Sequence, residues 1–270
     1  MDTIMKSDMV SKTPQYQKHF TDAIEYSVMK EKRFRPPLFL ESYKLLEKPE
    51  NITEKSLHLA NILAWCIDLI QGYMNMEDDT MDQSEFRCDD VCWHKKENIG
   101  VSSYKDSMFM YESAYVLLEK YFKDKSVYMP LINLFHEMNQ RLTIGQSLDW
   151  HWRLDRKLDM SMFSRNLFTT IGRNKGGFII VETAFRAASI LSDNYLKFLE
   201  IKDLIKEISY AFQVDVSWVI HFDDFYSEIS RTIFWTYSTM EKSKLILARI
   251  FDKDSALGWL SKFWKTEVNV

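Results

Sequence analysis

Three aspartates in the first third of the chain have a spacing that could hold a metal ion. Asp78, Asp79 and Asp82 end an apolar segment, residues 61–82, that contains no basic residue. Apolar side chains recur three and four residues apart in this segment, which predicts a helix. On a helix Asp78 and Asp82 lie one turn apart on one face, and Asp79 can reach the same region.

Oxygen ligands of this kind suit a hard divalent cation. Mg²⁺ commonly takes one or two carboxylates from the protein and leaves its other positions to water and substrate phosphate. The spacing therefore favours Mg²⁺ as cofactor, with Asp78, Asp79 and Asp82 as metal ligands and a diphosphate as substrate. A solvated acidic helix end is the alternative interpretation of a D-D-x-x-D run taken alone.

Composition narrows the class of protein. The 270 residues are 46% hydrophobic and 27% charged, as in an ordinary soluble protein. A net charge of −4 without a basic face argues against nucleic acid as a partner. Three cysteines are too few for a disulfide framework, which indicates a cytoplasmic location. No signal peptide is recognisable, and no apolar run approaches the roughly 20 residues of a membrane span.

Turn signals are sparse, which predicts long helices. Seven glycines and five prolines in 270 residues are few for a β protein. We see no linker or internal repeat, so we expect one all-α domain over residues 1–270. Helices are expected near residues 13–31, 35–47, 54–82, 104–122, 127–153, 159–190, 195–222, 236–251 and 255–265.

Several motifs, taken in order, resemble those of a known family. They are Lys32-x-x-Arg35, Gln71, Asp78-Asp-Thr-Met-Asp82 with Arg87, Ile144-Gly-Gln-Ser-Leu-Asp149, Arg173-Asn-Lys175 and Phe212-Gln213. From about Tyr26 to Asp224 the chain resembles farnesyl diphosphate synthases, members of the trans-isoprenyl diphosphate synthase family. The order and spacing of these motifs are those of the family, which makes the resemblance specific.

The resemblance implies a fold, a reaction and a set of site residues. The fold is a single-domain helical bundle with a central active-site cavity. Isopentenyl diphosphate is condensed with dimethylallyl or geranyl diphosphate to a prenyl diphosphate of ten to fifteen carbons. Asp78, Asp79, Asp82 and Lys175 are the implied catalytic residues. The residues implied to bind substrate diphosphate are Lys32, Arg35, Gln71, Arg87, Lys175 and Gln213, whose basic members would offset the charge of the diphosphate.

Two bulky residues lie where the family holds the growing chain. Tyr73 and Met74 precede Asp78 by five and four residues, and Tyr73 indicates a short product. An aromatic residue at helical spacing is also ordinary core, so that interpretation stays open.

Some features depart from the family pattern. Where the family has a second aspartate-rich motif, this chain has the run Val216-Ser-Trp-Val-Ile220. Cys88 stands in place of a second arginine after Arg87. The sequence stops at Val270, so we expect the domain to lack the last C-terminal helices of the family.

These departures leave three hypotheses open. The first is the condensation reaction, which the presence of Lys32, Arg35 and Gln71 supports. The second is a terpene synthase derived from the family, in which aromatic side chains of the second half stabilise carbocations. The third is an inactive or regulatory subunit that pairs with an active homologue. By resemblance, a homodimer or heterodimer is expected.

Overall fold

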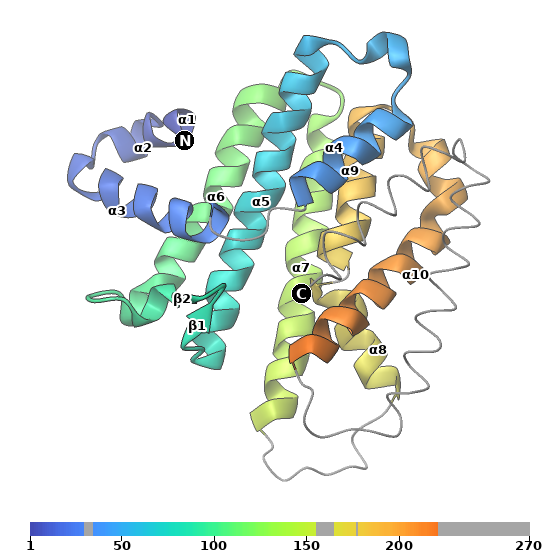
Figure 1. Ribbon diagram of the computed structural model, residues 1–270. Helices are drawn as coiled ribbons and strands as arrows, with labels where there is room; N and C mark the ends of the chain where they lie inside the picture. The colour runs from blue at the N-terminus through green and yellow to red at the C-terminus, as the bar shows by residue number, and fades with distance from the viewer. Residues whose placement is uncertain (30–34, 155–164, 177, 221–270) are drawn as a thin grey trace. The chain divides into compact units, whose positions relative to one another are not determined.

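The described residues fold almost entirely into helices (Figure 1). The computed structural model describes residues 1–29, 35–154, 165–176 and 178–220, and the statements below concern these residues. Its helices are α1 (Asp2–Met5), α2 (Asp8–Ser11), α3 (Pro14–Ile24), α4 (Arg35–Leu46), α5 (Glu54–Asp82), α6 (Ser103–Phe122), α7 (Tyr128–Leu154), α8 (Arg165–Asn174), α9 (Thr183–Leu191) and α10 (Tyr195–Ile220). The predicted all-α class is confirmed.

Shorter elements interrupt or connect these helices. Two are π-helical turns, Glu25–Met29 and Phe178–Glu182. Three are 3₁₀ turns, Pro49–Asn51, Trp93–Lys95 and Gly100–Ser102. The strands β1 (Phe86–Arg87) and β2 (Asp90–Val91) form an antiparallel hairpin.

The described residues gather into two compact units. The first comprises Met1–Gln140 and Arg186–Asn194, and the second comprises the described parts of Arg141–Phe185 and Tyr195–Val270. The single domain expected over residues 1–270 stays a prediction.

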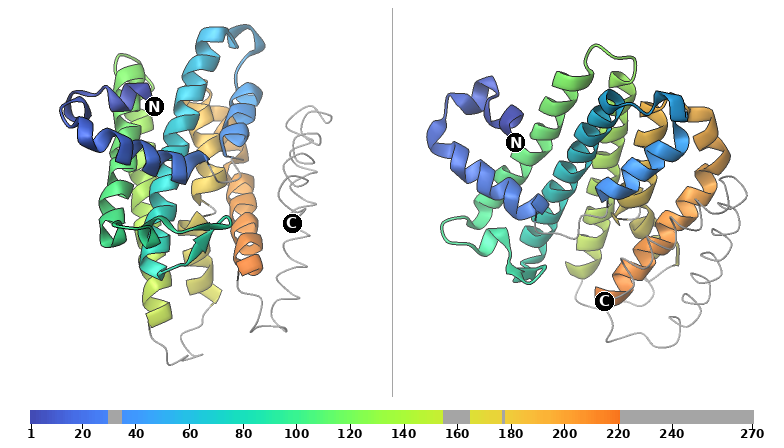
Figure 2. Two further views of the ribbon diagram at one scale, coloured as in Figure 1. Left: turned by 60° about the vertical axis from the view of Figure 1, so that its left-hand side comes forward. Right: turned by 45° about the horizontal axis from the view of Figure 1, so that its top comes forward.

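Helix α5 is the central element of the first unit. It packs against α6 and α4, and two further views show α5 and α6 side by side (Figure 2). A capping box starts it: Ser56 N–H donates to Thr53 Oγ1 at 3.2 Å, and Thr53 N–H donates to Ser56 Oγ at 2.9 Å. Such a box satisfies two backbone donors that the first turn leaves open. The core around α5 includes Leu63, Ile67, Ile70, Met110, Leu118, Phe135 and Met138, all 0–1% exposed.

The hairpin follows α5 directly. Its two-residue turn, Cys88-Asp89, has positive φ at both positions, 50° and 63°. This conformation matches the twist of a two-residue hairpin, and aspartate tolerates it better than most residues do. Strands of two residues produce no alternating pattern, which is why sequence analysis did not predict the hairpin.

Helix α10 packs against two other described elements of the second unit. It contacts both α8 and the π-helical turn Phe178–Glu182. Within α7, Gly145 lies against the end of α8: a Cβ atom there would come within 2.7 Å of the Asn174 backbone. Only glycine permits so close an approach of two backbones.

Most expected helices are confirmed. Those over 35–47, 54–82, 104–122, 127–153 and 195–222 lie within two residues of α4, α5, α6, α7 and α10. The helix expected over 13–31 is α3, continued by a π-helical turn. The prediction of one continuous helix over residues 159–190 is wrong. The described part of this range contains α8, a π-helical turn and α9. Adjacent glycines at 176 and 177 weaken a helix at that point. The helices expected over 236–251 and 255–265 lie outside the described residues.

Candidate active site

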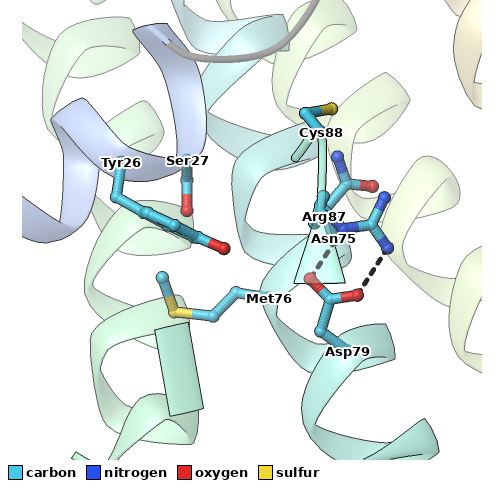
Figure 3. A pocket seen from close by; sticks show the side chains of 7 residues that line it. All are labelled: Tyr26, Ser27, Asn75, Met76, Asp79, Arg87 and Cys88. Carbon is cyan, nitrogen blue, oxygen red and sulfur yellow. Dashed lines mark hydrogen bonds and ion pairs between the residues drawn. The ribbon is translucent and has the colours of Figure 1, made fainter. Parts of the chain in front are cut away.

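The end of α5 and the hairpin bring an arginine against two of the three aspartates. Arg87 Nε donates to Asp79 Oδ2 at 2.6 Å, and Arg87 Nη2 donates to Asp79 Oδ1 at 2.7 Å (Figure 3). A third, longer contact of 3.5 Å joins Nη2 to Asp78 Oδ2. Paired hydrogen bonds between a guanidinium and a carboxylate are among the stronger polar interactions in proteins. The geometry therefore places a fixed cation beside the aspartate run.

Local backbone structure explains how Arg87 reaches Asp79. Helix α5 ends at Gln83, which adopts the left-handed conformation with φ 55°. Ser84 N–H then donates to the carbonyl oxygen of Asp79 at 3.0 Å, which caps the helix and reverses the chain. The hairpin begins two residues later and carries Arg87 back over the last turn of α5.

The three aspartates differ in their surroundings. Asp79 is only 3% exposed, whereas the side chain of Asp78 is 28% exposed and Asp82 is half-buried. Asp78 and Asp82 are therefore more accessible than Asp79 to a cation that arrives from solvent, and both oxygens of Asp79 accept hydrogen bonds from Arg87. No three His, Cys, Asp or Glu side chains in the described residues form a ready-made metal cluster. The three metal ligands inferred from the sequence stay a prediction.

A small pocket opens beside this ion pair (Figure 3). About 280 Å³ of empty space lies within it and in the open solvent beside it. Its walls come from the π-helical turn Glu25–Met29, from α5 and from the hairpin. Its lining residues are Tyr26, Ser27, Asn75, Met76, Asp79, Arg87 and Cys88. The pocket places side chains from three separate segments around the carboxylate of Asp79.

Sequence analysis missed five of these lining residues, Met76 among them. Asn75 had a usable signal, because it lies one helical turn after Gln71 and one before Asp79. No such sequence signal marked Tyr26, Ser27 or Cys88, because the π-helical turn Glu25–Met29 and the hairpin were not predicted.

Besides Arg87, two further expected diphosphate-binding residues lie in the same unit as this pocket. Gln71 is 8% exposed, and its Nε2 donates to Asn75 Oδ1 at 2.6 Å, so it touches a residue of the pocket wall. Arg35 is 9% exposed at the first position of α4. Lys32 lies outside the described residues. Their roles in binding stay predictions.

The two expected chain-length residues are buried on α5. Tyr73 is 5% exposed and Met74 is 4% exposed. The hydroxyl of Tyr73 donates to Asn139 Oδ1 on α7 at 3.2 Å, and its ring lies 5.1 Å from that of Tyr111 on α6. Burial, together with the nearby Glu77, raises the pKa of Tyr73, so its hydroxyl remains a donor at neutral pH. These contacts fix the Tyr73 ring between three helices.

The remaining expected residues belong to the second unit. Lys175 Nζ lies 2.7 Å from Asp149 Oδ2, and both side chains are mostly buried. The close contact at Gly145, one helical turn before Asp149 on α7, brings the two partners together. Gln213 lies on α10, and its side chain is outside the described part of the structure.

Two titratable groups near Asp79 are held neutral. Burial and the charge of Asp79 raise the pKa of the Cys92 thiol to about 12. Burial and the neighbouring Lys95 lower the pKa of His94, whose two ring nitrogens are buried without a hydrogen-bond partner among the described residues. Arg87 and the aspartates therefore dominate the charge of the site.

Comparison with known proteins identifies the family of the chain. The all-α class of the described residues agrees with the resemblance to isoprenyl diphosphate synthases. The family model described as polyprenyl synthetase matches residues 17–215, and the chain belongs to that family.

Several curated relatives carry related names. Farnesyl pyrophosphate synthase 1 of Cannabis sativa is 31% identical over 201 residues, 74% of this chain and 58% of the relative. Farnesyl pyrophosphate synthase 2 of Arabidopsis thaliana is 26% identical over 228 residues, 82% and 67% of the two chains. A bifunctional chrysanthemol synthase, chloroplastic, of Tanacetum cinerariifolium is 29% identical over 202 residues, 74% and 51%. The chain thus spans between about half and two thirds of the length of these relatives.

None of the described helices combines the length and apolar character that crossing a membrane requires.

Proposed function

We propose that the protein is a Mg²⁺-dependent prenyltransferase. It would condense isopentenyl diphosphate with dimethylallyl or geranyl diphosphate to a product of ten to fifteen carbons. The observation that carries this proposal is the position of Arg87 against Asp78 and Asp79, because it joins a cation and carboxylates at the mouth of one pocket. Family membership and the names of the relatives support the same activity.

The side chains around the pocket fit Mg²⁺ bound together with a diphosphate. Asp78 and Asp82 are partly exposed carboxylates that lie one helical turn apart at the end of α5. This is the donor set of an ion that takes its remaining ligands from water and phosphate. When bound, the ion would act as a Lewis acid and offset the charge of the departing diphosphate.

Cationic side chains would complete the binding of diphosphate. Arg87 is held in a fixed direction by Asp79, and Lys175 is held by Asp149 in the other unit. A cation whose direction is fixed before the reaction needs no reorganisation when charge develops on the leaving group. Lys32, Arg35, Gln71 and Gln213 belong to the same proposal.

A terpene synthase is the second candidate. Among the relatives are the chrysanthemol synthase above and a monoterpene synthase, chloroplastic, of Artemisia spiciformis that is 28% identical over 202 residues. Such an enzyme would ionise a prenyl diphosphate without condensing it. A cytoplasmic location and a dimer, with itself or with a homologue, complete the proposal.

One incubation separates these functions. Purified protein is supplied with Mg²⁺ and geranyl diphosphate, with and without isopentenyl diphosphate. We expect a longer prenyl diphosphate only when both substrates are present. Hydrocarbons or alcohols from geranyl diphosphate alone would replace the first proposal by the second. No turnover, alone or mixed with an active synthase, would favour an inactive or regulatory subunit.

Two controls test the metal assignment in the same assay. Removal of Mg²⁺ with a chelator and the substitution Asp78→Ala should each abolish turnover. Asp203→Ala removes an acid from α10 whose side chain is 84% exposed, and it should leave turnover unchanged. Full turnover by Asp78→Ala would refute the assignment of Asp78 as a ligand.

A further inference from the structure

The segment that carries Arg87 is fastened at both ends. At its start, Ser84 N–H donates to the carbonyl oxygen of Asp79 at 3.0 Å. Near its end, Cys92 N–H donates to the carbonyl oxygen of Glu85 at 3.0 Å and closes the base of the hairpin. The next residue is Trp93, which is 6% exposed. The position of Trp93 therefore sets the position of the hairpin base, two residues from Arg87.

Trp93 is anchored by a buried carboxylate that has no place in the proposed reaction. Trp93 Nε1 donates to Asp106 Oδ2 on α6 at 2.8 Å. The other carboxylate oxygen, Oδ1, lies 2.7 Å from His19 Nε2 on α3. Asp106 is 3% exposed, so both of its oxygens depend on partners within the protein. The carboxylate thus joins α3, α6 and the residue that follows the hairpin.

Trp93 also contacts the pocket wall, through Lys96 and Tyr26. Lys96 Nζ lies 5.4 Å from the centre of the Trp93 ring and 4.4 Å from that of Tyr26. The Tyr26 and Trp93 rings are 5.4 Å apart. Lys96 also lies 3.7 Å from Asp90 on β2. Tyr26, Trp93 and the hairpin are therefore parts of one contact network that begins at Asp106.

We propose that Asp106 is a positioning residue which, through Trp93, holds Arg87 in the orientation that binds Asp79 and a substrate diphosphate. Asp106 bonds to Trp93 and His19, neither of which lines the pocket, so it acts through the hairpin. Its effect on diphosphate rests on the proposed function, whereas its effect on the orientation of Arg87 does not.

The first test observes Arg87 directly. The Nε–H group of Arg87 gives an NMR signal that can be identified by its absence in Arg87→Lys. Its exchange with solvent is slowed by the hydrogen bond to Asp79. Trp93→Phe keeps a large ring and removes the N–H donor, and we expect it to speed that exchange about tenfold, as loss of a hydrogen bond to a charged group implies.

Two substitutions of Asp106 sharpen this test. Asp106→Asn keeps an oxygen that can accept from Trp93 and should preserve the slow exchange. Asp106→Leu removes the acceptor, and we expect the Arg87 signal to exchange faster in this variant. Ser113→Ala, which removes a buried hydroxyl elsewhere on α6, is the control and should change nothing. An unchanged Arg87 signal in both Trp93→Phe and Asp106→Leu would overturn the proposal.

The second test measures affinity for inorganic diphosphate with Mg²⁺ by calorimetry. Trp93→Phe should weaken binding about tenfold when Arg87 is present, and less than about twofold in an Arg87→Ala background, because its effect passes through Arg87. Equal losses in the two backgrounds would contradict this route. If the unaltered protein fails to bind diphosphate, the proposed function fails, and the exchange of the Arg87 signal still decides the role of Asp106.

Discussion

The guanidinium of Arg87 is paired through two hydrogen bonds of 2.6 and 2.7 Å with the buried carboxylate of Asp79. The two residues are eight positions apart, and a helix end, a left-handed residue and half of a hairpin lie between them. The pair neutralises the aspartate that is least exposed. Asp78 and Asp82 are consequently the two acids of the run that keep contact with solvent.

Removal of Arg87 should destabilise the fold. Arg87→Ala leaves the carboxylate of Asp79, 3% exposed, without its cation, and we expect a loss of roughly 3 kcal/mol in the free energy of unfolding. Asp79→Ala should cost less, because the side chain of Arg87 is 29% exposed and can be hydrated. Urea unfolding measures both. Lys44→Ala, which breaks an exposed pair with Glu41, is the control; a comparable loss there would contradict the argument.

A methyl group at Gly145 should disturb the Lys175–Asp149 pair. In Gly145→Ala the new Cβ would meet the Asn174 backbone at 2.7 Å and Lys175 N at 2.9 Å, so α7 and α8 must separate. We expect a loss of about 1–3 kcal/mol in stability from overpacking, together with reduced turnover in the proposed prenyl transfer. Ser147→Ala on the exposed side of α7 should have neither effect. Turnover retained by Gly145→Ala, but lost by Lys175→Met, would show that the position of Lys175 tolerates this shift.

The size of the side chain at position 73 should control product length. Tyr73→Ala removes a ring held between Asn139 and Tyr111, and we expect longer prenyl products because the space for the tail grows. Tyr73→Phe keeps the ring and should keep the original products. Chromatography of the dephosphorylated products measures the chain lengths. The same products from Tyr73→Ala as from the unaltered enzyme would show that Tyr73 is ordinary core.

His94 should make the fold sensitive to mild acid. Burial lowers the pKa of His94 below its ordinary value of 6.5, so the unfolded chain takes up a proton first as the pH falls. The stability contributed by neutral His94 is fully present above the pKa of His94 in the unfolded chain. It is lost as the pH falls toward the lower pKa of His94 in the folded protein. His94→Phe should therefore flatten the decline of Tm between about pH 7.5 and pH 5.5. His58→Gln is the control because His58 is exposed, and a decline unchanged by His94→Phe would rule His94 out as its cause.

The sequence by itself determined the helical class, the family and the long helices. Helix α5 was predicted over residues 54–82 because a long apolar periodicity and the absence of a turn signal within it are both local properties. The aspartates at its end were recognisable for the same reason, since their relative positions follow from the helix itself.

Only the tertiary structure decided which aspartate meets which cation. Arg87 reaches Asp79 within a segment in which Gln83, Cys88 and Asp89 adopt left-handed conformations, which these residue types do not specify by themselves. The anchoring of Trp93 by Asp106 and the contribution of Tyr26 to the pocket join residues 13 and more positions apart. Periodicity reports neighbours along one element, whereas a site built from several elements is fixed by how their side chains pack in three dimensions.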